Sequence, residues 1–378
     1  LKGDPRMADV VRRAVRTRQQ PLRHDLVVGY GITRLRLTVA ESEAIVREAR
    51  RRYRRHNAAR RYVEAEVFAA LADSGPDPLD PDTVRSRLRE APEVREALEW
   101  MWPVLTPAAL LHDLYGSRAL LRAAAGSLVD HDAVEALHRP RVAHPDDVVW
   151  TRADAPLLDE ALAVLGPRPG RKRTDAVRTY GHIVVDEAQD LSPMELRVLR
   201  RRSLNGSMTL VGDIAQATGA WAHDQWDDVI EPLRQRHDAR WTELTIGYRI
   251  PAPIMALASR VQAVAAPGLT PPRSVREQGQ APMIVTATDE LGTRVVEVAA
   301  AELAQVDPGN VSIICPLSLV EKVEKALADA GVDYGRATRR GLDHRLSVVP
   351  VPLVKGLEVD SAIVVEPAAI VAEEMQGL

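Results

Sequence analysis

The sequence predicts an α/β fold with mostly parallel sheets, interrupted by a helical segment. Two short apolar runs, residues 183–185 and 208–211, each end in acidic or Gly-Asp residues, as buried parallel strands often do. From residue 283 onwards strand and helix patterns alternate, which is typical of a parallel sheet with helices on both faces. At 378 residues the chain is long enough for two or three domains.

Charge is distributed unevenly along the chain, whose net charge is −3. Residues 1–61 contain 17 Lys or Arg against 6 Asp or Glu, a net charge of +11, so the remainder carries −14. This asymmetry predicts a polyanion or an acidic protein surface as a partner of the N-terminal part, the alternative being a solvated helix face. No apolar run is long enough for a membrane span, no signal peptide is recognisable, and the lone Cys315 excludes an internal disulfide. We therefore expect a cytoplasmic protein without a membrane partner.

The first 61 residues predict a helix, a strand and a second helix. Apolar residues at helical spacing indicate a helix over residues 4–18. Strict alternation over residues 34–39 indicates a half-buried strand, and a long arginine-rich helix is expected over residues 41–61.

Helical patterns dominate residues 62–144, which we interpret as an insertion into the first domain. Trp100 and Trp102 within it are better explained by core packing than by a binding surface. The first domain then resumes with a helix over residues 156–165, for which Asp154 is the expected cap and Gly166 the expected end.

The segment D-E-A-Q-D directly follows the run at residues 183–185. Ligands of open α/β sheets lie at the carboxyl ends of strands, where Asp186 and Glu187 are expected. One of these acids can hold Mg²⁺ and the other can polarise an attacking water. Alone, the pair is more often an acidic surface turn. The next helix has a strong start signal, with Ser192 as cap, Pro193 in first position and Glu195 completing a capping box.

The combination of D-E-A-Q-D-L-S-P-M-E-L-R with V-G-D-I-A-Q-A-T-G, at residues 211–219, is more specific. It resembles the Walker B segment and the following motif of UvrD-like superfamily 1 helicases, and most of all their HelD branch, which are helicase-like ATPases that bind bacterial RNA polymerase. The resemblance implies RecA-like domains, with the motifs spanning residues 186–360.

The resemblance also implies roles for residues of the first domain. Asp186 would hold Mg²⁺, Glu187 would activate water and Gln216 would sense the γ-phosphate, while Gln189 and Asp190 would lie at the nucleotide. Trp221 stands where UvrD-like helicases stack a base of single-stranded DNA, although packing beneath the cleft is as good an explanation. Gly219 replaces the second aromatic residue of those helicases, which speaks against DNA unwinding.

A second set of motif residues follows. L-T-I-G-Y-R-I-P, residues 244–251, resembles the start of the second RecA-like domain, where Tyr248 would stack on adenine and Arg249 would reach the γ-phosphate. L-V-K-G-L-E-V-D, residues 353–360, resembles a later motif. There Glu358 would bond the ribose hydroxyls, and Lys355 with Gly356 would shape a turn near phosphate or nucleic-acid backbone.

The second domain is predicted element by element. We expect a strand over residues 283–287, a helix over residues 291–304 and a strand over residues 311–315. Ser318 and Glu321 form an expected capping box for a helix that Gly331 ends. Strands over residues 347–351 and 362–365 follow.

The predicted organisation is a first RecA-like domain at residues 1–61 and 145–246, a helical insertion at residues 62–144 and a truncated second RecA-like domain at residues 247–378. No Walker A motif and no final arginine motif occur, so we expect a fragment that hydrolyses ATP negligibly by itself. In the full-length protein we expect ATP and Mg²⁺ as cofactors and hydrolysis coupled to binding and release of RNA polymerase. The alternatives are a UvrD-type DNA helicase and a non-catalytic polymerase-binding scaffold.

Overall fold

The computed structural model describes residues 1–77, 79–170, 178–217, 221–233, 239–287, 290–336 and 344–377. The chain divides into two compact units, Leu1–Glu243 and Leu244–Leu378, close to the boundary predicted at residues 246 and 247. The fold is mixed α/β, and every described strand pair except one hairpin is parallel. No helix in the described part of the chain has the length and apolar character to cross a membrane.

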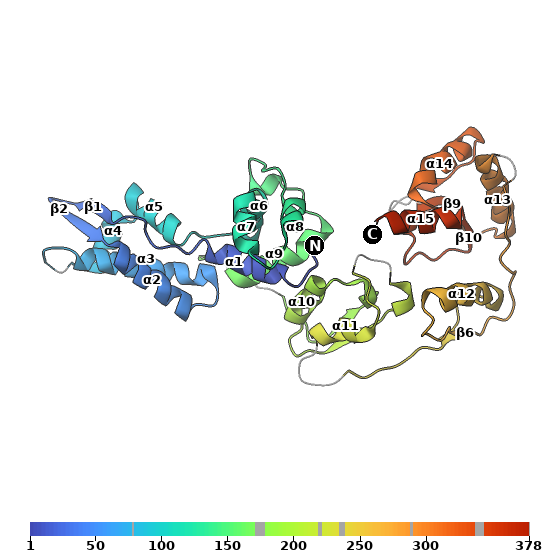
Figure 1. Cartoon of the computed structure of the whole chain (residues 1–378), viewed down its shortest axis with the longest axis horizontal. Coiled ribbons are helices and arrows are strands. Elements are labelled where there is room, and N and C mark those ends of the chain that lie inside the picture. The colour runs from blue at the N-terminus through green and yellow to red at the C-terminus, as the bar shows by residue number, and fades with distance from the viewer. Residues whose placement is uncertain are drawn as a thin grey trace. The chain divides into compact units, whose positions relative to one another are not determined.

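The described residues of the first unit form three hydrophobic cores. The first core joins an antiparallel hairpin to four helices, which lie together in Figure 1. These elements are β1 (Leu26–Tyr30), β2 (Thr33–Leu37), α2 (Val39–Arg52), α3 (His56–Asp73), α4 (Pro81–Leu88) and α5 (Pro92–Met101). Thr38 and Glu41 form the capping box that starts α2, and Asp80 caps α4 ahead of a proline in its first turn. Trp102 is buried in this core and Trp100 packs against it, as the core-packing interpretation predicts.

The second core is mainly helical. It consists of α1 (Met7–Arg16), α6 (Pro107–Tyr115), α7 (Arg118–Ala125), α8 (His131–Leu137) and α9 (Ala155–Leu165). In α1 the buried residues recur at helical spacing, so one face packs against α6, α7 and α9. Asp154 does not cap α9, contrary to the prediction. One oxygen of its buried carboxylate instead accepts the backbone N–H of Thr151 at 2.9 Å, in a capping box that opens the 3-10 turn η2 (Arg152–Asp154) ahead of α9. The other oxygen pairs with Lys2 at 2.9 Å and with Arg139 at 2.6 Å, which compensates the burial of the charge.

The third core carries the predicted strands of the first domain. It contains β3 (Ile183–Val185), β4 (Met208–Leu210), α10 (Pro193–Arg202) and α11 (Trp226–Ile230), with short 3-10 turns at η4 (Ala188–Asp190), η5 (Ile214–Gln216) and η6 (Glu231–Leu233). β3 and β4 pair in parallel, as predicted. They are not buried on both faces, however, since Val184 in β3 is 69% exposed and Val211, directly after β4, is 45% exposed.

The structure corrects the extent of two predicted parts. The helix expected over residues 41–61 is two helices, α2 and α3, because Tyr53 and Arg55 adopt extended backbone conformations. The predicted boundary between residues 61 and 62 therefore falls inside α3. Residues 22–61 share the core of residues 62–102, and they do not pack with β3 and β4.

The second unit is built on a four-stranded parallel sheet in the order β10-β7-β9-β8. The strands are β7 (Val311–Cys315), β8 (Gly335–Arg336), β9 (Leu346–Pro350) and β10 (Ser361–Val364), accompanied by α13 (Leu291–Gln305), α14 (Val320–Asp329), α15 (Pro367–Gly377), η7 (Leu317–Leu319) and η9 (Val351–Leu353). Residues of α13 and α14 share a core with Val311, Ile313, Cys315 and Val348. Cys315 is fully buried there, as expected of a small apolar residue.

A smaller parallel pair precedes this sheet. β5 (Ile246–Gly247) pairs with β6 (Arg273–Ser274), beside α12 (Ala252–Ala265). Two predictions in this unit are wrong. Residues 283–287 form no strand, and Met283 and Ile284 are 74% and 89% exposed, so no neighbour buries the run. Ser318 does not cap α14, because it lies within the 3-10 turn η7 and Leu319 occupies the position before α14. The backbone N–H of Ser318, which a capping box would have given to Glu321, bonds the carboxylate of Glu373 on α15 at 3.0 Å.

His56, at the start of α3, is a buried titratable residue of the first core. Its ring is buried and stacks on Trp102 with centroids 5.0 Å apart. Nδ1 accepts a hydrogen bond from Gln19 at 3.2 Å, so Nε2 carries the hydrogen and donates to the carbonyl of Pro103 at 2.7 Å. Burial lowers the pKa of His56 to about 4, and the folded state therefore holds this imidazole neutral.

We expect the first unit to lose stability as the pH falls from about 6.5 to about 4. In that window the unfolded chain binds a proton at His56 that the folded chain does not bind, so acid favours unfolding. Once the pH is below both pKa values, the free energy of unfolding should have fallen by roughly 3 kcal/mol. Urea unfolding at pH 7, 5 and 4 measures the effect. His56→Gln keeps the polar contacts and cannot titrate, so its free energy of unfolding should fall less steeply. Equal pH slopes for the two proteins would refute this role of His56.

Candidate functional site

The two acidic motifs of the first unit meet at one edge of the β3–β4 pair. The backbone N–H of Val211 donates to the carbonyl of Val185 at 2.8 Å, and that of Ala188 donates to the carbonyl of Val211 at 3.1 Å. Both strands therefore end at the same edge, and the turns that follow them lie side by side. Ligands of parallel sheets bind at this edge, so the position fits the sequence-based expectation.

Glu187 has an unusual backbone conformation. Its φ and ψ are 52° and 41°, in the left-handed region that costs a residue with a side chain about 1–2 kcal/mol. Its backbone N–H donates to Oδ1 of Asp186 at 3.0 Å, which fixes the turn. Asp186 is exposed and Glu187 is half-buried, so the two adjacent acids differ in environment. A strained acidic residue at a strand end is typical of a functional site.

The side chain of Gln189 connects the two motifs. Its side chain is fully buried, and its Nε2 donates to Oε2 of Glu187 at 2.6 Å. Its Oε1 accepts from the backbone N–H of Asp213 at 3.2 Å. Both ends of the amide are thus engaged within the protein. Gln189 therefore supports Glu187, and its contact with a nucleotide stays a prediction.

Asp213 extends this connection to Gln216. The Nε2 of Gln216 donates to Oδ2 of Asp213 at 2.7 Å, and the other carboxylate oxygen accepts from the backbone of Ala215 at 3.0 Å. Glu187, Gln189, Asp213 and Gln216 therefore form one hydrogen-bonded series. Gln216 is exposed, and its short 3-10 turn, η5, lies beyond β4. Sequence reasoning missed Asp213 and Gly212, although a Gly-Asp pair directly after a strand marked the place.

Gly212 leaves the space that this connection needs. A Cβ atom at this position would lie 2.1 Å from Oε1 of Gln189, 3.0 Å from Trp226 and 3.2 Å from the backbone nitrogen of Ala188. Gln189 cannot move aside without breaking its bond to Glu187.

Gly212→Ala is accordingly expected to lower the free energy of unfolding by about 1–3 kcal/mol, because an overpacked site must shift backbone or a buried side chain. Gly181→Ala is the matched control, since a Cβ there would have nothing within 4 Å. Urea unfolding of both variants checks the prediction, and equal stability of the two would show that the turn accommodates the extra methyl group.

Helix α10 is fixed at its start as the sequence predicts. Ser192 accepts from the backbone of Glu195 at 3.3 Å, and Glu195 accepts from the backbone of Ser192 at 2.8 Å, which completes the capping box. Pro193 occupies the first turn. The backbone N–H of Met194 also donates to the carbonyl of Gly3 at 3.1 Å, so the N-terminal segment lies against this helix.

Trp221 is half-buried next to the same helix start. A Cβ atom at Gly3 would lie 2.4 Å from Nε1 of Trp221 and 2.6 Å from Cβ of Ser192, so the indole contacts Gly3 closely. The indole therefore packs against the N-terminal segment near the start of α10. Base stacking by Trp221 stays a prediction from resemblance, and Gly219 lies outside the described residues.

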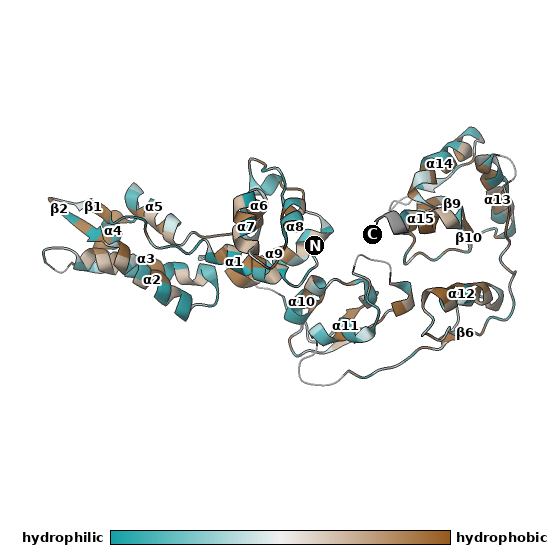
Figure 2. Ribbon diagram, viewed as in Figure 1, coloured by the Kyte–Doolittle hydropathy of each residue, from teal (hydrophilic) through white to brown (hydrophobic). Residues whose placement is uncertain are grey.

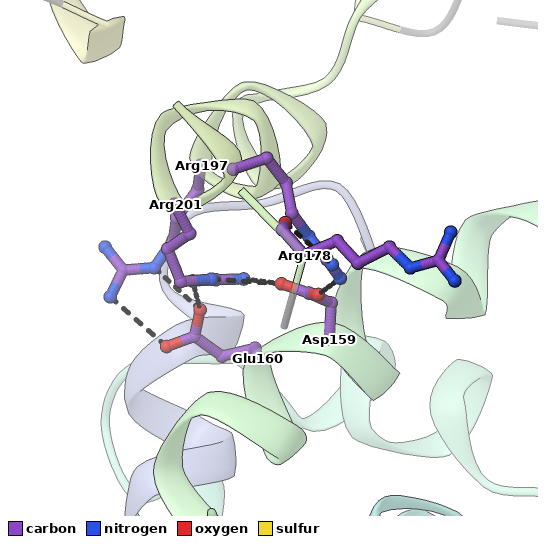
Figure 3. Close-up of polar contacts among 6 residues, drawn as sticks. Asp159, Glu160, Arg178, Arg197 and Arg201 are labelled. Atoms are coloured by element: carbon purple, nitrogen blue, oxygen red, sulfur yellow. Dashed lines mark hydrogen bonds and ion pairs between the residues drawn. The ribbon is translucent and has the colours of Figure 1, made fainter. Parts of the chain in front are cut away.

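Ion pairs join α10 to α9 (Figure 3). Glu160, which is 2% exposed, receives a bidentate contact from Arg197 at 2.8 and 3.2 Å and also pairs with Arg201. Asp159 pairs with Arg201 at 2.6 Å and with Arg202. The helix that follows the acidic turn is thereby joined to the second core, where Met194 is also buried.

The second unit holds the remaining predicted residues. Tyr248 is 73% exposed directly after β5, and a guanidinium nitrogen of Arg249 lies 2.5 Å from Oε1 of Glu358. Gly356 has a φ of 79°, so the turn requires the left-handed conformation that glycine adopts easily. Lys355 is half-buried in the same turn. The structure thus brings Arg249 and Glu358 together within their unit, whereas their approach to Glu187 and Gln216 stays a prediction.

The residues present fit a magnesium ion bound together with a nucleotide. Among the described residues no group of three or more His, Cys, Asp or Glu side chains is arranged to hold a metal by itself. Mg²⁺ normally takes one or two carboxylates and fills its remaining positions with water and phosphate oxygens. Asp186, an exposed acid followed directly in the chain by Glu187, matches this pattern. The third acid of the motif, Asp190, ends the 3-10 turn η4 and is half-buried.

No protein-family model matches the chain, and no curated protein matches it either.

Proposed function

We propose that this chain is the Walker B-bearing part of a superfamily 1 helicase-like ATPase of HelD type, built on two RecA-like domains. In the full-length protein, ATP hydrolysis would drive the binding and release of bacterial RNA polymerase. The observation that carries the proposal is the hydrogen-bonded series from Glu187 through Gln189 and Asp213 to Gln216. It couples the residue that would activate water to the residue that would sense the γ-phosphate.

The chain's own residues have distinct proposed roles. Asp186 would hold Mg²⁺, which when bound neutralises charge on the phosphate oxygens. Glu187, oriented by Gln189, would accept a proton from the attacking water, since general bases act through such positioned carboxylates. Gln216 and Arg249 would contact the γ-phosphate. Tyr248 would cover the adenine, Glu358 would bond the ribose and Lys355 would lie near phosphate or nucleic-acid backbone.

The pairing of Arg249 with Glu358 supports their membership of one site. The side chain of Arg249 is 77% exposed and that of Glu358 is 67% exposed. A ligand could therefore replace their mutual contact without disrupting buried structure. An arginine is suited to phosphate and a carboxylate to ribose hydroxyls. The segments that carry them are about one hundred residues apart in the chain, and each contributes one of the two groups.

Two observations favour the HelD-type proposal over its alternatives. Trp221 is half-buried against Gly3, whereas DNA unwinding of the UvrD type would need this ring to reach a base. The strained conformation of Glu187 argues against a non-catalytic scaffold, because a residue with no chemical task has no reason to retain that cost. DNA remains a second candidate partner of the full-length protein.

The proposed function is tested by polymerase release. Full-length protein bound to RNA polymerase should release it on addition of Mg·ATP and should keep it bound with a non-hydrolysable analogue. The 378-residue chain alone, which has no Walker A motif, should show negligible turnover at millimolar Mg·ATP. Release that is equally fast without nucleotide would favour the scaffold alternative. Displacement of a DNA strand by the full-length protein would favour the helicase.

A further inference from the structure

An arginine-rich corner joins α2 to α3. Residues 47–62 contain eight arginines and one glutamate. We define the α2–α3 corner by six exposed residues at the end of α2, in the connecting turn and in the first turns of α3. They are Arg47, Arg51, Arg52, Tyr53, Arg54 and Arg61. Figure 2 shows predominantly hydrophilic residues along α2, in line with this composition.

Few negative charges balance this corner. Glu48 alone pairs with Arg51, at 2.7 Å, and with Arg52. Their hydrogen bonds, that from Arg51 first, lower the pKa of Glu48 to about 2. Across the described residues, no carboxylate pairs with Arg47, Arg54 or Arg61. The corner therefore keeps a clear excess of positive charge.

Helix stability explains only part of this charge. Arg50, Arg51 and Arg52 lie in the last turn of α2, where cations interact favourably with the helix dipole. Arg54 and Arg55 immediately precede α3, whose positive end disfavours them. α3 has no acidic residue in its first turn and no side-chain cap. The fold thus places cations at a helix start that does not stabilise them, and an external anion would be attracted there.

Aromatic rings lie among these arginines. The rings of Tyr53 and Tyr62 are 5.6 Å apart at an angle of 37°, and the guanidinium of Arg52 lies 5.1 Å from the Tyr62 ring. Tyr53 is 36% exposed, so part of its ring is available to a ligand. Binding of an acidic protein would require only the positive charges of the arginines, and not an accessible ring. Arginines interleaved with an accessible ring are suited to phosphates and unpaired bases.

We propose that the α2–α3 corner binds single-stranded nucleic acid, with the arginines on the phosphate backbone and Tyr53 against an unpaired base. This surface belongs to the first core and is separate from the turns after β3 and β4. Binding of nucleic acid at this surface can therefore be tested independently of the proposed ATP hydrolysis.

Fluorescence anisotropy with a labelled oligothymidylate tests the proposal on the 378-residue chain. Arg54→Glu combined with Arg61→Glu should weaken binding about tenfold or more at moderate salt and should make the salt dependence of the affinity shallower by about 1.4 log units per decade of salt. Arg89→Glu combined with Arg95→Glu changes the net charge equally on exposed arginines outside the corner, and should alter affinity no more than about twofold. Circular dichroism confirms that each variant is folded.

Two further arms identify the ligand class. Tyr53→Ala should weaken single-strand binding several-fold and duplex binding less, because only an unpaired base can stack on the ring. Polyglutamate should compete much less well than the oligonucleotide. The proposal is overturned if the oligonucleotide does not bind at low salt, if both double variants weaken it equally, or if duplex binds as tightly as single strand. Equal competition by polyglutamate would assign the corner to an acidic protein.

Discussion

Glu160→Ala is expected to lower the free energy of unfolding of the first unit by about 3 kcal/mol. The carboxylate is 2% exposed and holds Arg197 in a bidentate contact while also pairing with Arg201. Removing it leaves Arg197 without its carboxylate partner and leaves Arg201 with Asp159 alone at this helix–helix contact. Such a loss costs far more than the net value of the intact pair, because the remaining charges stay partly desolvated.

Urea unfolding of the variant and of a matched control measures this loss. Glu135, in α8, also pairs with two arginines, Arg118 and Arg122, but its side chain is 32% exposed and both arginines are exposed. Glu135→Ala should therefore change the unfolding midpoint much less, since exposed ion pairs contribute little. If both variants shift the midpoint equally, burial of Glu160 is not the source of its effect.

Glu187→Gln in the full-length protein is expected to reduce the kcat of ATP hydrolysis by a factor of about 10²–10⁴, the usual contribution of a general base. The replacement has nearly the same shape, and its amide oxygen can still accept the hydrogen bond from Gln189. Nucleotide affinity should therefore change little, so the loss should appear in kcat and not in binding. Steady-state kinetics together with nucleotide titration separates the two quantities.

Glu195→Gln is the matched control for this prediction. Glu195 lies eight residues further on and completes the capping box of α10, a role that glutamine also fills. Its kcat should stay close to that of the unchanged protein. Hydrolysis by Glu187→Gln at the same rate as by Glu195→Gln would remove Glu187 from the proposed chemistry.

Local signals in the sequence predicted local structure well. The capping box of Ser192 and Glu195 was predicted because all its partners lie within four residues. The apolar runs at β3, β4, β7, β9 and β10 likewise marked strands that the structure contains. Their parallel pairing follows from the alternation of strands and helices.

Predictions that depended on distant partners were less successful. Ser318 had the right neighbours for a cap, yet Glu373, 55 residues away, takes its backbone N–H. Asp154 pairs with Lys2, which no local pattern connects to it. The break between α2 and α3 has no glycine or proline to announce it, since Tyr53 and Arg55 turn the chain by adopting extended conformations.

In the candidate site, too, local signals were predictable and contacts between distant residues were not. The motifs identified Asp186, Glu187 and Gln216 by residue type and spacing. The bond between Gln189 and Asp213 joins residues 24 positions apart, and it exists because β3 and β4 are neighbours in the sheet. The role of Gly212 depends on that contact, so neither could be predicted from the sequence alone.

The central claim is that the edge after β3 and β4 binds a metal–nucleotide complex through Asp186. Electron paramagnetic resonance of Mn²⁺·ATP titrated into the full-length protein tests it most directly, because bound and free Mn²⁺ give different signals. Asp186→Asn should weaken the binding of Mn²⁺·ATP about tenfold or more, whereas Asp132→Asn, which alters an exposed acid on α8, should leave it unchanged. Equal binding by the two variants would contradict the assignment of this site.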